Sequence, residues 1–140
     1  MRYKKTGIVL FFILCLLALF IYNSCQHRDI IIQEAKIVSG VDKNLNPLKE
    51  TTLFSKNTSK ACCWLKWRDA KINTQVLTKW YYVTDDLPIY DYVLNIPKRE
   101  GVANVVLAMP EGKTLPPGIY KVDILCGKKR LAKTLNFEIE

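Results

Sequence analysis

Histidine is almost absent from this sequence, which limits the chemistry that the chain can carry. His27 is the single histidine among 140 residues, and it lies close behind an apolar N-terminal segment. A catalytic triad, a histidine general base and most zinc sites therefore have no candidate in the remaining chain. Gly-rich phosphate loops, haem-attachment motifs and calcium-loop spacings are also missing. We expect no catalytic residues, no metal and no cofactor, and we interpret Asp85-Asp86 as turn residues.

Acidic residues are too few to balance the basic ones. The chain has 21 Lys and Arg against 13 Asp and Glu, a net charge of +8. Arg2, Lys4 and Lys5 account for three of these positive charges, so the chain after the apolar segment is near +5. A surplus of this size is explained by solubility alone and does not indicate nucleic-acid binding. We expect no nucleic-acid partner.

Long apolar runs are confined to the N-terminus. The run from Gly7 to Tyr22 follows the basic residues, as in signals that direct a chain to the export machinery. Residues 1–25 have two main interpretations, a lipoprotein signal and a membrane anchor. Cleavage at an unrecognised site is a third alternative. Ser24-Cys25 fits the lipobox of a bacterial lipoprotein, in which the signal is removed and Cys25 is acylated, although Tyr22 departs from the usual leucine. Alternatively, the segment stays as an uncleaved membrane anchor. Either interpretation predicts an extracytoplasmic, membrane-anchored protein, on the periplasmic side of a bacterial membrane or at the cell surface.

No convincing helix follows the apolar segment, and residues 26–140 have the size of one domain. Short segments with period-two alternation, separated by turn residues, predict about eight strands. In the segment 61–68, for example, Cys63, Leu65 and Trp67 share one face, and Cys62, Trp64 and Lys66 share the other. The expected strands are 29–38, 51–55, 61–68, 75–83, 89–96, 102–109, 119–126 and 131–139. Strands at this spacing predict an all-β fold, an antiparallel sandwich.

Three features give the exported part a resemblance to a known family. They are the turn-rich stretch 40–47, the tryptophans Trp67 and Trp80 on middle strands, and the segment 115–122 with its Leu-Pro-Pro-Gly-Ile-Tyr sequence. Together they resemble the immunoglobulin-like β-sandwich domains of bacterial envelope lipoproteins and surface proteins. The resemblance implies an antiparallel immunoglobulin-like sandwich of 7–8 strands and a binding or accessory role, and it transfers no active-site residues.

Three cysteines remain once Cys15 and Cys25 are assigned to the N-terminal segment. Strand alternation directs Cys63 and Cys126 inward, so a disulfide between them would join two sheets. In the chain-entropy model such a bridge contributes roughly 3–4 kcal/mol. Pairing of Cys62 with Cys126, and unpaired thiols, are the alternatives.

Trp64 and Tyr81 fall on the strand faces opposite the expected core. Exposed aromatic side chains on a sheet stack on sugar rings or form a protein-binding hot spot; burial of both sheet faces is the simpler alternative. The sequence therefore predicts a non-enzymatic, membrane-tethered β-sandwich that binds an envelope protein, as an accessory subunit of a complex. The alternative is a carbohydrate- or peptidoglycan-binding module that uses Trp64 and Tyr81 on a cell-wall glycan.

Overall fold

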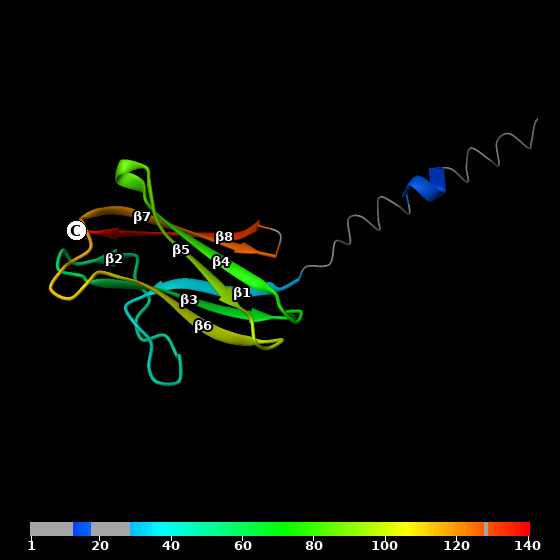
Figure 1. The fold of residues 1–140 in the computed structure, drawn as a ribbon, viewed down its shortest axis with the longest axis horizontal. Coiled ribbons are helices and arrows are strands. Elements are labelled where there is room, and N and C mark those ends of the chain that lie inside the picture. Colours follow the sequence, from blue (N-terminus) through cyan, green and yellow to red (C-terminus); the bar gives the residue numbers. More distant parts are fainter. Residues whose placement is uncertain (1–12, 18–28, 128) are drawn as a thin grey trace, which may run out of the picture.

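The computed structural model describes residues 13–17, 29–127 and 129–140. Residues 13–17 are helical, and the rest of this part consists of strands, turns and one short 3-10 helix (Figure 1). Within the described ranges, no helix has the length and apolar character needed to cross a membrane. Most of the segment 1–25, including the predicted acylation site Cys25, lies outside the described residues, as does His27.

The strands follow the alternating segments of the sequence, with ends that differ from the prediction by at most two residues. They are β1 (Ile31–Val38), β2 (Leu53–Phe54), β3 (Lys60–Arg68), β4 (Gln75–Tyr82), β5 (Leu87–Asn95), β6 (Gly101–Ala108), β7 (Gly118–Cys126) and β8 (Arg130–Ile139). The 3-10 helix η1 (Val83–Asp85) joins β4 to β5, so Asp85 lies in a turn, as predicted.

The strands form two sheets. The three-stranded sheet has the order β1-β3-β6, and the five-stranded sheet has the order β2-β8-β7-β4-β5. All pairings are antiparallel except that of β2 with β8, which is parallel. In Figure 1 the strands β1, β3 and β6 form one layer, below β7 and β8 in the view. The prediction of an all-β fold is confirmed.

The core lies between the two sheets and is built around aromatic side chains. Trp80 is fully buried and packs edge to face with Phe137, with 6.2 Å between the ring centroids. Tyr120 stacks on the same Phe137 ring, with 4.9 Å between the centroids. The Trp80 indole N–H donates to the buried hydroxyl of Thr78 over 3.3 Å, so neither polar group is left unpaired. Other core members come from both sheets: Ala35, Ile37, Cys63, Leu65, Trp67, Val76, Val105, Val122, Ile124, Cys126 and Ile139.

The proline-rich loop before β7 is held by two tyrosines. The hydroxyl of Tyr120 donates to the carbonyl oxygen of Pro116 over 2.6 Å, and that of Tyr82 donates to the carbonyl oxygen of Pro117 over 2.6 Å. Gly118 follows at φ 140°, a conformation that side chains disfavour, and a Cβ there would lie 2.7 Å from the Tyr82 ring. The sequence element Leu-Pro-Pro-Gly-Ile-Tyr thus fixes where β7 begins.

Candidate functional site

The outer face of the five-stranded sheet carries a row of four aliphatic side chains, here called the apolar row. Strand register places Leu131 beside Leu125, Leu125 beside Leu77, and Leu77 beside Val93. Leu77 and Leu125 point away from the core because their strand neighbours are buried in it. Cross-strand pairing places Val93 and Leu131 on the same face. Leu131 is 56% exposed and Val93 is 47% exposed, while the two between them are half-buried. A solvent-facing sheet surface is usually polar, so a continuous apolar row on it marks an interaction site.

Polar residues border the apolar row on one side. The next positions along the strands bring together Thr134, Asp123, Lys79 and Asp91, in that order across β8, β7, β4 and β5. The Thr134 hydroxyl donates to one carboxylate oxygen of Asp123 over 2.7 Å, and Lys121 Nζ lies 3.3 Å from the other. An apolar centre with a hydrogen-bonded polar rim is the usual anatomy of a protein interface.

Tyr81, predicted to bind a ligand, lies two positions beyond Lys79 on the same outer face. Its ring is half-buried, and the Lys121 ammonium lies 4.5 Å from the ring centroid. This contact is a cation–π interaction, and it occupies one face of the ring. Tyr81 therefore belongs to the border of the apolar row rather than forming an open stacking platform.

Trp64 corrects the prediction of an exposed aromatic residue. It points to the outer face of the three-stranded sheet, as alternation indicated, but it is only 6% exposed. The loop between β1 and β2, which projects from this sheet in Figure 1, covers it, and the carbonyl oxygen of Leu45 accepts its indole N–H over 2.7 Å. Together with Val38 and Cys62 it forms a second small core. Trp64 and Tyr81 also lie on different sheets, so they do not form one site.

The predicted disulfide between Cys63 and Cys126 is not formed. Both are free buried thiols in the main core, and Cys62 is a free thiol on the opposite face of β3. Burial raises the pKa of Cys63 to about 12 and also raises the pKa of Cys126, so both thiols are protonated and unreactive at neutral pH.

The two inward-facing cysteines belong to different sheets. Cys63 is paired with Ile37 and Val105 in the three-stranded sheet, and Cys126 is paired with Val76 and Arg130 in the five-stranded sheet. Inward direction alone does not make a disulfide, because the two Cα atoms must also lie within about 7 Å of each other.

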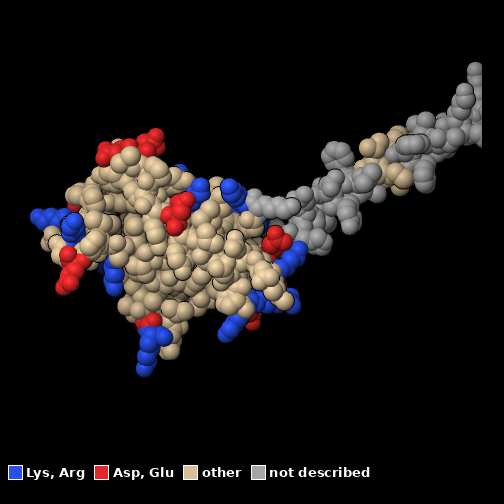
Figure 2. Space-filling view, in the orientation of Figure 1, with Lys and Arg blue, Asp and Glu red and all other residues tan. Residues whose placement is uncertain are grey.

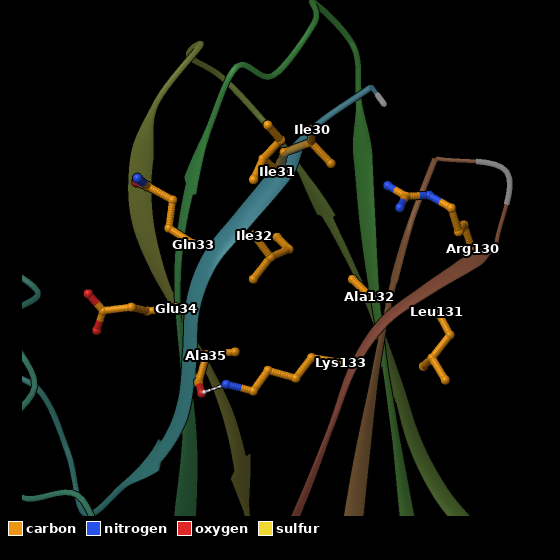
Figure 3. Close-up of a pocket in the computed structure, with 10 residues that line it drawn as sticks. All are labelled: Ile30, Ile31, Ile32, Gln33, Glu34, Ala35, Arg130, Leu131, Ala132 and Lys133. Atoms are coloured by element: carbon orange, nitrogen blue, oxygen red, sulfur yellow. Dashed lines mark hydrogen bonds between the residues drawn. The ribbon is translucent and has the colours of Figure 1, made fainter. Parts of the chain in front are cut away.

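A groove of about 240 Å³ lies between the first halves of β1 and β8, lined by Ile30–Ala35 and Arg130–Lys133 (Figure 3). Lys133 crosses it, and its Nζ donates to the carbonyl oxygen of Ala35 over 3.0 Å. Gln33 on β1 and Ala132 on β8 are β-bulge positions, at which the ladders skip a residue. Bulges and inward-pointing lysines are devices that keep strand edges from pairing. We therefore interpret the groove as a gap between two strand edges that are protected from pairing with another strand, rather than as a ligand site.

Groups suited to catalysis do not converge in the part of the chain that the structure describes. No cluster there holds three or more His, Cys, Asp or Glu side chains that could bind a metal. Among the carboxylates of the described residues, only that of Asp42 has a clearly lowered pKa, because Asn46 donates hydrogen bonds to it. This bonding closes a turn and is a structural role. The apolar row remains the surface with the clearest functional character.

Sequence reasoning identified the faces of Leu77 and Tyr81 but not the row. Leu77 is four residues before Tyr81 on the same strand, so alternation places both opposite the buried side chains, which is where the structure has Leu77. The row depends on which residues of β5, β7 and β8 lie beside Leu77, and pairing register is set by contacts between distant segments. Alternation places Leu77 and Leu125 outward, but it places Leu131 inward together with Leu135 and Phe137. The bulge at Ala132, where the ladder with β7 skips a residue, turns Leu131 to the outer face.

No protein-family model matches the sequence, and no curated protein matches it. Two solved structures share part of the backbone arrangement. One is a β-glucuronidase of Parabacteroides merdae, 13% identical, with 79% of this chain and 13% of that chain covered at a TM-score of 0.45. The other is the alkylpurine DNA glycosylase AlkC of Pseudomonas fluorescens bound to DNA containing an abasic site analog, 8% identical, with 88% and 33% covered at a TM-score of 0.46. This chain therefore spans a third or less of the length of either protein.

Proposed function

We propose that this protein is a membrane-tethered, extracytoplasmic immunoglobulin-like sandwich that binds an envelope protein without enzymatic activity. The observation that carries the proposal is the apolar row of Leu77, Val93, Leu125 and Leu131 on an otherwise solvent-facing sheet. Full burial of one leucine side chain contributes about 1.5–3 kcal/mol. A partner that covers the exposed parts of these four side chains would give the interface an apolar centre.

The strand connections support the immunoglobulin-like part of the proposal. The sheet of β1, β3 and β6 faces the other sheet, in which β7 lies between β4 and β8. Tyr120 lies near the start of β7 and bonds back to the Pro116 carbonyl, four residues upstream. This arrangement matches the tyrosine corner of immunoglobulin-like sandwiches, and it supports the proposed fold family.

The N-terminal sequence supports the tether. Arg2, Lys4 and Lys5 precede the apolar run, and Cys25 follows it. A basic start keeps the N-terminus in the cytoplasm, and the chain beyond the run is carried across the membrane. Acylated Cys25 and a retained anchor are both compatible with the tether. Mass spectrometry of the mature N-terminus distinguishes them, because it finds either lipid on Cys25 or an intact Met1.

The state of the aromatic side chains favours a protein partner over a glycan. Sugar rings stack on open aromatic faces, but Trp64 is buried under a loop and one face of Tyr81 is occupied by Lys121. Aliphatic side chains such as those of the apolar row offer no such ring. They suit the apolar centre of a protein–protein interface.

A pair of variants tests the proposed interface in the full chain, purified from membranes in detergent. Leu77→Ser in the apolar row is expected to weaken co-purification of a stoichiometric protein at least tenfold, which corresponds to about 1.4 kcal/mol. Val106→Ser is the control, because Val106 is an exposed apolar residue on the other, three-stranded sheet. Equal recovery with both variants would refute the role of the row. Binding to peptidoglycan that is lost in Tyr81→Ala would support the glycan alternative instead.

A further inference from the structure

The strand β5 is an edge strand that is exposed on both faces. It pairs with β4 on one side only, and every residue except Leu94 is exposed. Tyr90 and Tyr92 are 36% and 41% exposed although they share the inward-facing side of the sheet. β5 crosses the middle of Figure 1, and in the same view Figure 2 shows mainly uncharged atoms there, with charged side chains mostly toward the periphery. An edge of this kind is a template for pairing with another strand.

The backbone of β5 has free hydrogen-bonding groups at defined positions. Ile96, just after the strand, donates its N–H to the carbonyl oxygen of Thr74 over 3.0 Å. Because backbone groups alternate in direction along a strand, those of Leu94 and Tyr92 also point to β4. The N–H and C=O groups of the odd-numbered residues therefore point to the free side. Asp91, Val93 and Asn95 present them there.

Only the second half of β5 is open to pairing. Pro88 has no N–H, and Ile89 is a bulge position, which the ladder with β4 skips between Tyr90 and Pro88. Both features hinder the addition of a strand to the first half. The groove-side edges of β1 and β8 carry bulges and the crossing Lys133 described above. The segment Asp91–Asn95 has no comparable protection.

We infer that a second copy of this chain pairs with β5 in antiparallel fashion, in the register that places Val93 opposite Val93 of the other copy. In this register Asp91 lies opposite Asn95, a compatible polar pair. A register centred on Asp91 would place two carboxylates directly opposite each other, which destabilises a sheet. A register centred on Tyr92 would place each Asp91 carboxylate beside an apolar Val93.

The Val93 register also makes the apolar row continuous through the dimer. Val93 ends the row in each copy, so pairing two of them joins eight aliphatic side chains across a ten-stranded sheet, five strands from each copy. The two-fold axis stands perpendicular to the sheet, which puts both rows on the same side. Pairing uses the backbone edge of β5, so it does not require an envelope partner on the sheet face, although Val93 belongs to both surfaces.

Disulfide trapping tests the register directly in the full chain in detergent. Residues in a hydrogen-bonded antiparallel pair have Cα atoms about 5.5 Å apart, within the range for a disulfide. Val93→Cys is therefore expected to give a disulfide-linked dimer under mild oxidation. Asp91→Cys alone should not, since its two copies are offset by four residues, about 13 Å. A mixture of Asp91→Cys and Asn95→Cys chains should give the mixed dimer. The unsubstituted chain measures the background from Cys15 and Cys25.

A second measurement separates pairing through β5 from association through the N-terminal segment. Sedimentation equilibrium in detergent should show a concentration-dependent dimer for the unsubstituted chain and a monomer for Val93→Asp, which places two further carboxylates at the contact. Val93 is half exposed, so this substitution leaves the core intact. A dimer that persists in Val93→Asp, or equal trapping of Asp91→Cys and Val93→Cys, would overturn the inference. Trapping through Val93→Cys, with no envelope protein co-purifying with the unsubstituted chain, would contradict the proposed function alone.

Discussion

Replacing Tyr120 by phenylalanine tests whether the proline-rich loop is pinned by a single hydroxyl. The ring is 1% exposed and stacks on Phe137, and phenylalanine keeps both features. Only the 2.6 Å hydrogen bond to the carbonyl oxygen of Pro116 is lost. A hydrogen bond contributes about 0.5–1.5 kcal/mol net, and an acceptor left without its donor away from water costs about 1–3 kcal/mol. We expect the free energy of unfolding to fall by about 1–2 kcal/mol.

The control for this prediction is Tyr82→Phe. Tyr82 donates a hydrogen bond of the same length to the next carbonyl, that of Pro117, but in a more exposed setting where water replaces the hydroxyl. Its loss should lower stability by less than about 0.5 kcal/mol. Urea unfolding at pH 7, followed by tryptophan fluorescence, measures both variants. Equal losses, or no loss in Tyr120→Phe, would refute the argument that burial makes the Tyr120 bond the stronger one.

The same hydroxyl predicts a pH dependence. Burial, and secondarily the neighbouring Tyr82, raises the pKa of Tyr120 to about 12, above the value of about 10 in an unfolded chain. The folded state thus favours the protonated form, so the contribution of Tyr120 is fully present below pH 10 and is lost as the pH rises toward 12. Unfolding curves between pH 9 and 12 should show a smaller alkaline loss in Tyr120→Phe than in the unsubstituted chain.

Three further perturbations test the packing. Gly118→Ala should lower the free energy of unfolding by about 2 kcal/mol or more, because its Cβ would lie 2.6 Å from the Thr84 hydroxyl. Gly112→Ala, at φ 77° in open space, should lower it by only about 1 kcal/mol. Equal losses in urea unfolding would contradict the crowding at Gly118. Trp64→Phe should cost about 1 kcal/mol and speed hydrogen exchange in the loop covering it, since it removes the N–H bond to that loop; unchanged exchange would argue against this cover. Alkylation without reductant should label Cys63 and Cys126 only after unfolding, and a need for prior reduction would show that they are bridged.

Alternation in the sequence was sufficient to predict the strands and most of the core. Cys63, Leu65 and Trp67 face inward in β3, as do Val76 and Trp80 in β4, because period two fixes which residues share a face. Alternation could not predict that the three-stranded sheet leaves the inward-facing residues of β5 exposed. That outcome depends on how many strands each sheet has, which no local pattern contains.

The candidate site shows the same division between local and distant information. The outward direction of Trp64 and Tyr81 was predicted correctly, but their accessibility was not. Trp64 is covered because its indole N–H bonds to a loop residue 19 positions earlier in the sequence. The cysteines likewise face the core as predicted, and only the pairing of β7 with β8 reveals that Cys126 lies level with Arg130. Register and loop cover arise from tertiary contacts.

The parallel contact of β2 with β8 has a consequence for how the molecule is assembled. Glu138 and Glu140 donate their backbone N–H groups to the carbonyl oxygens of Thr52 and Phe54, so the end of β8 is clamped by a segment some 86 residues earlier. β8 also covers one edge of β7, from Gly118 to Cys126. A chain in which residues 130–139 have not yet been synthesised can therefore neither complete the five-stranded sheet nor bury Val122 and Ile124 fully. Folding of the body must await the last strand, and the preceding strands stay open to wrong partners until it arrives.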